Sequence, residues 1–138
     1  MLNKKARFEY HILEEYTAGV VLLGSEVKSL RLGNASVEEA YCIFVDGEIF
    51  IRNMHIDPYL QAPQQHEPRR DRKLLLKKIE IQRISDKMID KSLTLVPLAV
   101  HIDGLIKIKF GIGKGKKLYD KRQTIKDRDI ARETREEI

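Results

Sequence analysis

Cysteine and long apolar runs are scarce in this sequence. Cys42 is its single cysteine, which excludes an intramolecular disulfide framework and any multi-cysteine zinc or iron–sulfur site. No stretch approaches the roughly 18 apolar residues of a membrane span, and the charged N-terminal segment is not followed by an apolar region. We therefore expect a soluble cytoplasmic protein that is not exported and does not contact a membrane.

The sequence also lacks the patterns of a metal, cofactor or catalytic site. Its four histidines show neither i, i+4 pairing nor clustering with acids. They are His11, His55, His66 and His101. The glycine-rich run 111–117 lacks the Gly-Lys-Ser/Thr ending of a phosphate-binding loop, and no paired carboxylates stand at a useful spacing. We predict no metal, no cofactor and no enzymatic activity.

Positive charge is the main feature of the composition. Lys and Arg number 26 against 21 Asp and Glu, so the net charge is +5. Charged residues make up 34% of the chain, compared with roughly 25% in ordinary domains. A basic excess favours polyanionic partners through long-range attraction. The length of 138 residues suits a fold around one core.

Hydrophobic alternation and turn residues predict a mainly β fold with short helices. The expected elements are two strands in 8–23, a short helix over 26–32 that ends at Gly33, hairpins over 41–52 and 95–112, a proline-containing loop over 56–68, and a helix after Pro68 that breaks near Ser85. Asp46-Gly47 and Asp103-Gly104 mark the hairpin turns because these pairs tolerate positive φ. Cys42, on the first hairpin, is interpreted as a small core residue. Together the elements predict an OB-like antiparallel β-barrel with about three helices at its openings.

The composition changes sharply at Lys114. From there to Ile138, few apolar residues interrupt dense charges of both signs. The segment therefore lacks an apolar stripe with which a helix could pack on a core. We predict an OB-like RNA-binding barrel domain over 1–113 and a basic C-terminal tail over 114–138 that is disordered when free.

Basic residues gather in three clusters. The clusters are Lys4, Lys5 and Arg7, then the run 69–73, then the lysines of 114–117. Cations at the start of the helix expected after Pro68 would oppose its macrodipole, and a bound polyanion would relieve this. Tyrosines interleave with the clusters and could stack on bases; they are Tyr10, Tyr59 and Tyr119. We predict binding of RNA or single-stranded nucleic acid, with a solvated basic surface as the alternative for each cluster.

Five strings of residues, in order over residues 3–128, resemble a known family. They are Asn3-Lys-Lys-Ala-Arg-Phe-Glu-Tyr10, Gly24-Ser-Glu-Val-Lys-Ser-Leu-Arg31, Arg72-Lys-Leu-Leu-Leu76, Leu93-Thr-Leu-Val-Pro-Leu98 and Lys114-Gly-Lys-Lys-Leu-Tyr-Asp-Lys-Arg122. Together they resemble the SsrA-binding protein family, also called small protein B.

This resemblance implies a bacterial, cytoplasmic RNA-binding protein. It implies an OB-like barrel with three helices that binds the tRNA-like domain of transfer-messenger RNA and delivers it to stalled ribosomes. There trans-translation tags the unfinished peptide and rescues the ribosome. The resemblance also implies that the tail becomes helical on the ribosome and enters the vacant mRNA channel near the decoding centre. We expect the protein to be monomeric.

The resemblance also implies a set of site residues. The expected tmRNA-binding residues are Lys4, Lys5, Arg7, Glu26, Lys28, Arg31, His66, Arg69, Arg70, Arg72 and Lys73. The expected ribosome-binding tail residues are Lys114, Lys116, Lys117, Tyr119, Asp120, Lys121 and Arg122. Glu26 has three alternative roles: accepting hydrogen bonds from base amino groups, orienting a neighbouring Arg or Lys, or acting as a helix-start acid. After Arg122, acidic residues dilute the positive charge, which departs from the family pattern.

Two other functions are weighed against this one. A ribosomal or ribosome-assembly RNA-binding protein would share the size, charge and barrel, but it would bind ribosomes regardless of their translation state. A small nuclease or RNA-modifying enzyme would need catalytic residues at useful spacing, and the sequence shows none.

Overall fold

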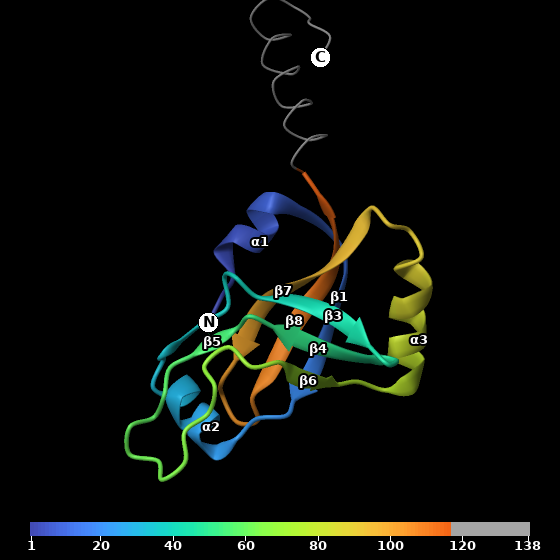
Figure 1. Cartoon of the computed structure of the whole chain (residues 1–138). Coiled ribbons are helices and arrows are strands. Elements are labelled where there is room, and N and C mark those ends of the chain that lie inside the picture. Colours follow the sequence, from blue (N-terminus) through green and yellow to red (C-terminus); the bar gives the residue numbers. More distant parts are fainter. Residues whose placement is uncertain (117–138) are drawn as a thin grey trace, which may run out of the picture.

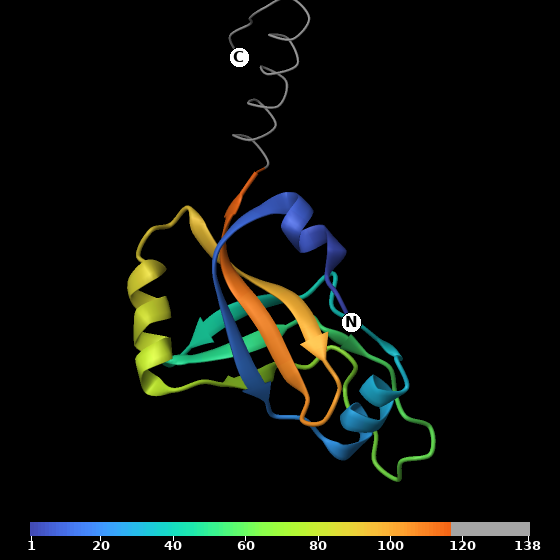
Figure 2. The same cartoon turned by 180° about the vertical axis from the view of Figure 1, so that it is seen from behind.

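The computed structural model describes residues 1–116, which form a curled antiparallel sheet flanked by helices (Figure 1). The elements in chain order are α1 (Lys4–Glu9), β1 (Tyr10–Val20), α2 (Gly24–Arg31), β2 (Ala35–Ser36), β3 (Tyr41–Val45), β4 (Glu48–Arg52), β5 (His55–Ile56), β6 (Arg72–Leu75), α3 (Lys78–Lys87), β7 (Leu93–His101) and β8 (Lys107–Gly115). Helices α1 and α2 lie at opposite ends of the curled sheet, and α3 lies along its side (Figures 1 and 2). No helix in the described range is long and apolar enough to span a membrane.

β1 is the strand around which the main sheet is organised. The strand order is β3-β4-β6-β1-β8-β7, and β2 and β5 form a separate pair. β1 pairs with β8 along most of its length and with β6 at Gly19 and Val20. The curl brings the edge strands β3 and β7 against each other, although no ladder joins them within residues 1–116. The predicted OB-like antiparallel fold with about three helices is confirmed.

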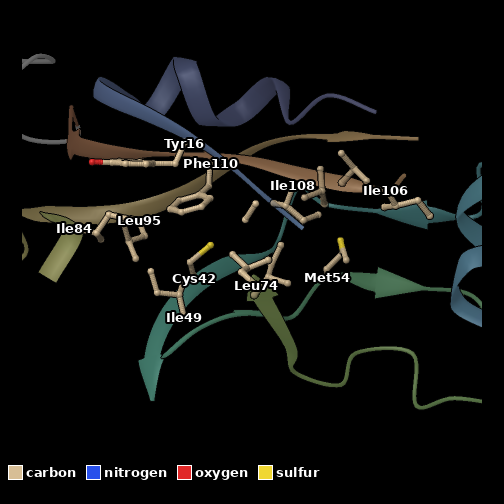
Figure 3. Packing of buried hydrophobic residues seen from close by; sticks show 14 of the residues in the cluster. Tyr16, Cys42, Ile49, Met54, Leu74, Ile84, Leu95, Ile106, Ile108 and Phe110 are labelled. Carbon is tan, nitrogen blue, oxygen red and sulfur yellow. The ribbon is translucent and has the colours of Figure 1, made fainter. Parts of the chain in front are cut away.

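The core fills the inside of the curled sheet (Figure 3). Ile108 and Phe110 point inward from β8 with no exposed surface, while the lysines beside them face outward, which confirms the predicted alternation. The ring of Tyr16 stacks on Phe110 with a centroid distance of 5.8 Å. Ile84 enters the same core from α3, and Cys42 is buried in it, which confirms its interpretation as a core residue. Burying one such large aliphatic or aromatic side chain contributes about 1.5–3 kcal/mol.

The first hairpin and α2 have the predicted bounds to within two residues. β3 and β4 are joined at Asp46 and Gly47, whose φ angles are 51° and 79°. Gly33 follows α2 with a φ of 81°, as predicted for a left-handed helix stop. The second hairpin differs, because residues 102–106 separate β7 from β8 and only Gly104 of the expected turn pair has positive φ. Its connection is therefore longer than the two-residue turn that the sequence predicted.

Residues 8–23 contain one strand rather than the two that we predicted. β1 runs unbroken from Tyr10 to Val20, with one register shift between Ile12 and Glu14. The preceding residues form α1, whose Ala6 packs with Val96 and Leu98. An isolated helix of this length is unstable in water, so α1 depends on this tertiary contact and leaves little local signal.

The segment after Pro68 begins as a strand, which corrects the predicted helix. Leu74 of β6 pairs with Ile49 on one side and with Val20 on the other, and its side chain has no exposed surface. α3 begins only at Lys78 and continues through Ser85, where we expected a break. The spacing of the apolar residues in this segment also fits a helix. The strand forms because pairing with β4 and β1 satisfies the backbone hydrogen-bonding groups of β6 on both sides.

β8 extends into the glycine-rich run as far as Gly115. A Cβ on Gly111 would lie 2.7 Å from Cγ2 of Ile12 and 2.8 Å from the carbonyl oxygen of Glu14. This position therefore requires glycine because β1 and β8 approach closely there. Lys114 and Gly115 still belong to β8, so the predicted domain boundary after residue 113 falls inside the strand.

Candidate nucleic-acid interface

A buried ion-pair cluster joins α2 to the segment around β6. Nε of Arg72 donates to Oε2 of Glu26 at 2.6 Å, and neither side chain has exposed surface. Arg70 donates to the same carboxylate from Nη2 at 2.6 Å and from Nε at 2.9 Å. The backbone N–H of Leu23 donates to Oε1 of Glu26 at 2.8 Å. Glu26 therefore binds both arginines and the start of α2 at once.

Every terminal nitrogen of Arg72 also has a partner inside the protein. Nη1 donates to the carbonyl of Met54 at 2.7 Å, and Nη2 donates to the carbonyl of Pro68 at 3.1 Å. Burial lowers the pKa of Arg72, while the charge of Glu26 opposes that effect. Arginine nevertheless remains charged in proteins because its unperturbed pKa is so high. A buried charge of this kind is tolerated when it is paired and hydrogen-bonded.

The carboxylate of Glu26 is held in its ionised form. Burial alone raises its pKa, but the hydrogen bonds from Arg70 and Leu23 and the charge of Arg72 outweigh burial, and the pKa lies below its ordinary value. Glu26 and Arg72 thus lie beneath the surface on which we expected RNA contacts, and in this structure neither can touch a phosphate or a base. Of the three alternatives for Glu26, the structure shows the contacts needed for orienting an arginine and for capping the helix start.

His66 ties the proline-containing loop to α2. Its Nε2 lies 2.8 Å from the carbonyl of Ile56, and its Nδ1 lies 2.7 Å from Oγ of Ser25. A carbonyl oxygen can only accept, so Nε2 carries a hydrogen. The side chain is almost fully buried. His66 therefore positions the loop, and its contact with RNA stays a prediction.

Four of the predicted residues form a basic surface around α2, which we call the α2 surface. They are Lys28, Arg31, Arg69 and Arg70. Arg31 donates to the carbonyl of Gly104 at 2.9 Å, and Arg69 donates to Oδ1 of Asn53 at 2.8 Å. Arg70 keeps 28% of its side chain exposed while it binds Glu26. These contacts, to neutral acceptors or to one shared carboxylate, hold the guanidinium groups in fixed positions. A guanidinium group held in this way can form charge-assisted hydrogen bonds with an anion.

The N-terminal cations form a separate basic surface at the other end of the barrel. This α1 surface comprises Lys4, Lys5, Arg7 and Lys116, whereas Lys114 lies at the end of β8 opposite Leu93 and interacts with Asp90. Lys116 joins it because its backbone N–H donates to the carbonyl of Glu9 and its Nζ donates to the carbonyl of Arg7 at 3.3 Å. Figures 1 and 2 both place α1 and α2 at opposite ends. The structure thus divides the predicted tmRNA-binding set between two ends.

Several cations of the α1 surface already have acidic partners. Arg7 pairs with Glu15 at 2.8 Å, and Lys5 pairs with Glu39 at 3.5 Å. All four side chains are substantially exposed, and such pairs contribute at most about 1 kcal/mol. A phosphate could therefore replace either carboxylate at small cost.

The predicted basic cluster 69–73 is divided between two places, and the lysines that follow it at 77 and 78 lie in a third. Arg69 and Arg70 belong to the α2 surface, whereas Lys73 faces outward from β6 and pairs with Glu48 at 3.1 Å. The lysines at the start of α3 lie along the side of the barrel. Because residues 69–73 do not begin a helix, the macrodipole reasoning applied to them was wrong. Of the predicted tail residues, Lys117, Tyr119, Asp120, Lys121 and Arg122 lie outside the described residues.

A hollow of about 540 Å³ lies beside the α2 surface, and sequence reasoning did not anticipate it. The first turns of α2 form one wall, and the proline-containing loop forms the other. Its lining residues are Leu23, Gly24, Ser25, Lys28, Tyr59, Gln61, Ala62, Pro63, Gln64 and Gln65. The only local signal was a loop with Tyr59 and several glutamines next to a basic run. In the described part of the chain, no group of three or more His, Cys, Asp or Glu side chains is placed to hold a metal.

Comparison with known proteins places this chain in a family. The sequence model described as "SmpB protein" matches residues 1–138. The chain is 51% identical over 134 residues to the SsrA-binding protein of Neorickettsia sennetsu, which covers 95% of this chain and 91% of that relative. It is 51% identical over 134 residues to the SsrA-binding protein of Chlorobaculum tepidum, covering 95% of this chain and 85% of the relative.

A solved structure shows the same similarity in three dimensions. The structure described as "tmRNA-SmpB: a journey to the center of the bacterial ribosome" aligns with a TM-score of 0.70 and 41% sequence identity. The alignment covers 100% of this chain and 98% of that chain. The chain therefore belongs to the SmpB protein family.

Proposed function

We propose that the protein binds the tRNA-like domain of transfer-messenger RNA and delivers it to stalled ribosomes for trans-translation. The observation that carries this proposal is similarity along nearly the whole chain to proteins named SsrA-binding and to a structure described as tmRNA-SmpB in the bacterial ribosome. The protein acts in the cytoplasm by binding alone, without catalysis or a cofactor.

The α2 surface supports the RNA-binding half of the proposal. Arg70 is held by Glu26 and Arg69 by Asn53, so both guanidinium groups are oriented before an RNA arrives. Lys28 and Arg31 lie one turn apart on α2 and are both exposed. Ordered arginines give charge-assisted contacts to phosphate at low entropic cost. Glu26, His66 and Arg72 serve this surface from beneath as positioning residues.

The α1 surface supports the ribosome-binding half of the proposal. Lys116 lies there beside Arg7, Lys114 precedes it at the end of β8, and the chain continues from Lys116 into residues 117–138. We assign the basic residues from Lys117 to Arg122 to the ribosome. Tyr119 would stack on an exposed base while the cations neutralise rRNA phosphates. One end of the barrel would thus hold tmRNA while the other faces the ribosome.

The first experiment identifies the RNA and tests its mode of binding. The protein is recovered from its host, its bound RNA is sequenced, and affinity for that RNA is measured by gel shift at 50 and 200 mM salt. We expect one abundant tRNA-like species, and with roughly six phosphate contacts a loss of affinity on the order of a thousandfold across this range. Recovery of ribosomal RNA regardless of translation state would favour the ribosomal-protein alternative.

The second experiment separates the two contacts. Truncation after Lys116 preserves β8 and the hydrogen bond from Lys116 to Glu9. We expect near-normal tmRNA affinity but lost peptide tagging in a reconstituted stalled-ribosome assay. The full-length Tyr119→Ala/Lys121→Ala/Arg122→Ala variant should behave in the same way. Normal tagging by the truncated protein would refute this division of labour.

A further inference from the structure

The hollow beside α2 has the chemistry of a small-ligand site. Its volume of about 540 Å³ lies within the range of roughly 300–1,000 Å³ that is typical of such sites. Leu23, Ala62 and Pro63 give it apolar walls, and Tyr59 adds an aromatic ring. The glutamines of the loop supply amide groups that can both donate and accept hydrogen bonds. An apolar slot with amide groups at its edge suits a flat heterocycle.

The loop that forms the outer wall is braced by its own hydrogen bonds. Nε2 of Gln65 donates to the carbonyls of Tyr59 at 2.7 Å and Ala62 at 3.0 Å. The hydroxyl of Tyr59 donates to Oε1 of Gln61 at 2.7 Å. Next to Gln65, the buried His66 fastens the loop to Ser25 at the floor of the hollow. Because the wall is ordered before a ligand enters, binding costs little conformational entropy.

Charge identifies the class of occupant. Among the described residues that line the hollow, Lys28 carries a positive charge and none carries a negative one. A second hollow, of about 220 Å³ near α1, is instead lined by Glu9, Glu38 and Glu39 with Lys5. Three carboxylates make the inside of that hollow the less favourable of the two for an anionic group, whereas Lys28 attracts an anion to the hollow beside the α2 surface. The occupant should therefore combine a flat ring with a negative charge. A nucleotide has both, because its base fits the apolar slot and its phosphate can pair with Lys28.

We propose that the hollow between α2 and the loop 59–65 receives one unstacked nucleobase of the bound RNA, with Tyr59 as the stacking platform and Lys28 on the adjoining phosphate. This inference rests on the proposed function and adds a base-binding site to it. Phosphate contacts on the α2 surface carry most of the affinity, whereas the hollow fixes the register of a single-stranded loop. Amide groups on three glutamines allow some choice among bases.

The direct test uses a fluorescent base. A short single-stranded oligoribonucleotide with one 2-aminopurine is titrated with the full-length protein, and an otherwise identical RNA with an abasic site at that position is titrated in parallel. Stacking on tyrosine should quench the 2-aminopurine. The abasic RNA should bind roughly fivefold to a hundredfold more weakly, as expected for losing one base–aromatic stack. Equal affinity for the two RNAs would overturn the proposal.

Three variants locate the site. Tyr59→Ala should abolish the quenching, whereas Tyr59→Phe should keep it because the ring remains. Tyr41→Ala is the matched control, since Tyr41 is a tyrosine with 45% exposure that lines the second hollow. Thermal unfolding of each variant checks that the fold is intact. Quenching that survives in Tyr59→Ala would place the base elsewhere and overturn the proposal.

A separate measurement distinguishes this inference from the proposed function. Affinity for a complete tRNA-like RNA is measured with the wild-type protein. If that RNA binds no better than an arbitrary duplex, the proposed function fails. If the tRNA-like RNA binds tightly, but 2-aminopurine is not quenched and the abasic RNA binds as tightly as the intact RNA, only the base-binding proposal is refuted. Displacement of the oligonucleotide by a proline-containing apolar peptide, with no effect of the abasic site, would assign the hollow to a peptide and also overturn the proposal.

Discussion

Glu26 on α2 and Arg72 on β6 form an ion pair at 2.6 Å in which neither side chain has exposed surface. The two residues are separated by 46 positions in the chain, so their contact fixes the helix against the sheet and cannot form before both are in place. Arg70 receives its orientation from the same carboxylate. The pair therefore connects the stability of the fold to the geometry of the α2 surface.

Glu26→Ala should be strongly destabilising. Removal of the carboxylate leaves Arg72 buried and unpaired, which typically costs about 3–5 kcal/mol. The free energy of unfolding in urea measures this loss. Glu39→Ala is the control, because Glu39 is exposed and pairs with Lys5 at 3.5 Å, and it should leave the urea midpoint unchanged. Equal stability of the two variants would show that the buried pair adds nothing.

The stability contributed by Glu26 should depend on pH. Burial raises its pKa, but Arg70, Leu23 and Arg72 outweigh this and the folded pKa lies below the ordinary value of 4.5. A lowered folded pKa stabilises the protein above the unfolded pKa, and that stability disappears as pH falls through the folded pKa. Wild type should therefore exceed Glu26→Gln in stability at pH 7, and the difference should shrink below about pH 4.5. A difference that stays constant down to pH 3 would contradict this assignment.

Neighbouring arginines should have different effects when each is replaced. Arg69→Ala and Arg70→Ala should each lower the slope of log affinity against log salt by about one, as expected for one lost phosphate contact. Arg70→Ala should also lower the urea midpoint, because Glu26 loses a partner, whereas Arg69→Ala should not. Lys77→Ala, an exposed cation next to α3, is the control for RNA affinity. Unchanged affinity in both arginine variants would remove the α2 surface from the interface.

Two glycines of β8 should differ in their tolerance of a methyl group. Gly111→Ala places Cβ 2.7 Å from Ile12 and 2.8 Å from the backbone of Glu14, and overpacking of this kind costs about 1–3 kcal/mol. Gly115→Ala meets nothing closer than the Tyr10 ring at 3.9 Å and should be nearly neutral. Urea unfolding of both variants measures the contrast. Similar midpoints would show that the two strands can separate freely at Gly111.

The elements that the sequence alone determined depend on contacts between near neighbours. Asp46-Gly47 specified the first hairpin because its turn needs two positive φ angles. Gly33 marked the end of α2 because the residue after a helix often needs a positive φ angle, which glycine adopts easily. The alternation along β8 identified its inward face. Each of these signals is contained in a few consecutive residues. The basic excess and the family motifs, which are distributed along the chain, predicted an RNA partner.

Tertiary structure decided the features that join distant segments. Residues 72–75 became a strand because β4 and β1 pair with both of its edges, although their spacing also fits a helix. A charged Glu26 was expected at the surface, but two arginines and a backbone N–H allow it to be buried. The basic clusters divided between opposite ends, and the hollow arose where the loop folds back on α2. Local sequence cannot specify these outcomes, because each depends on the free energy of groups that meet only in the folded chain.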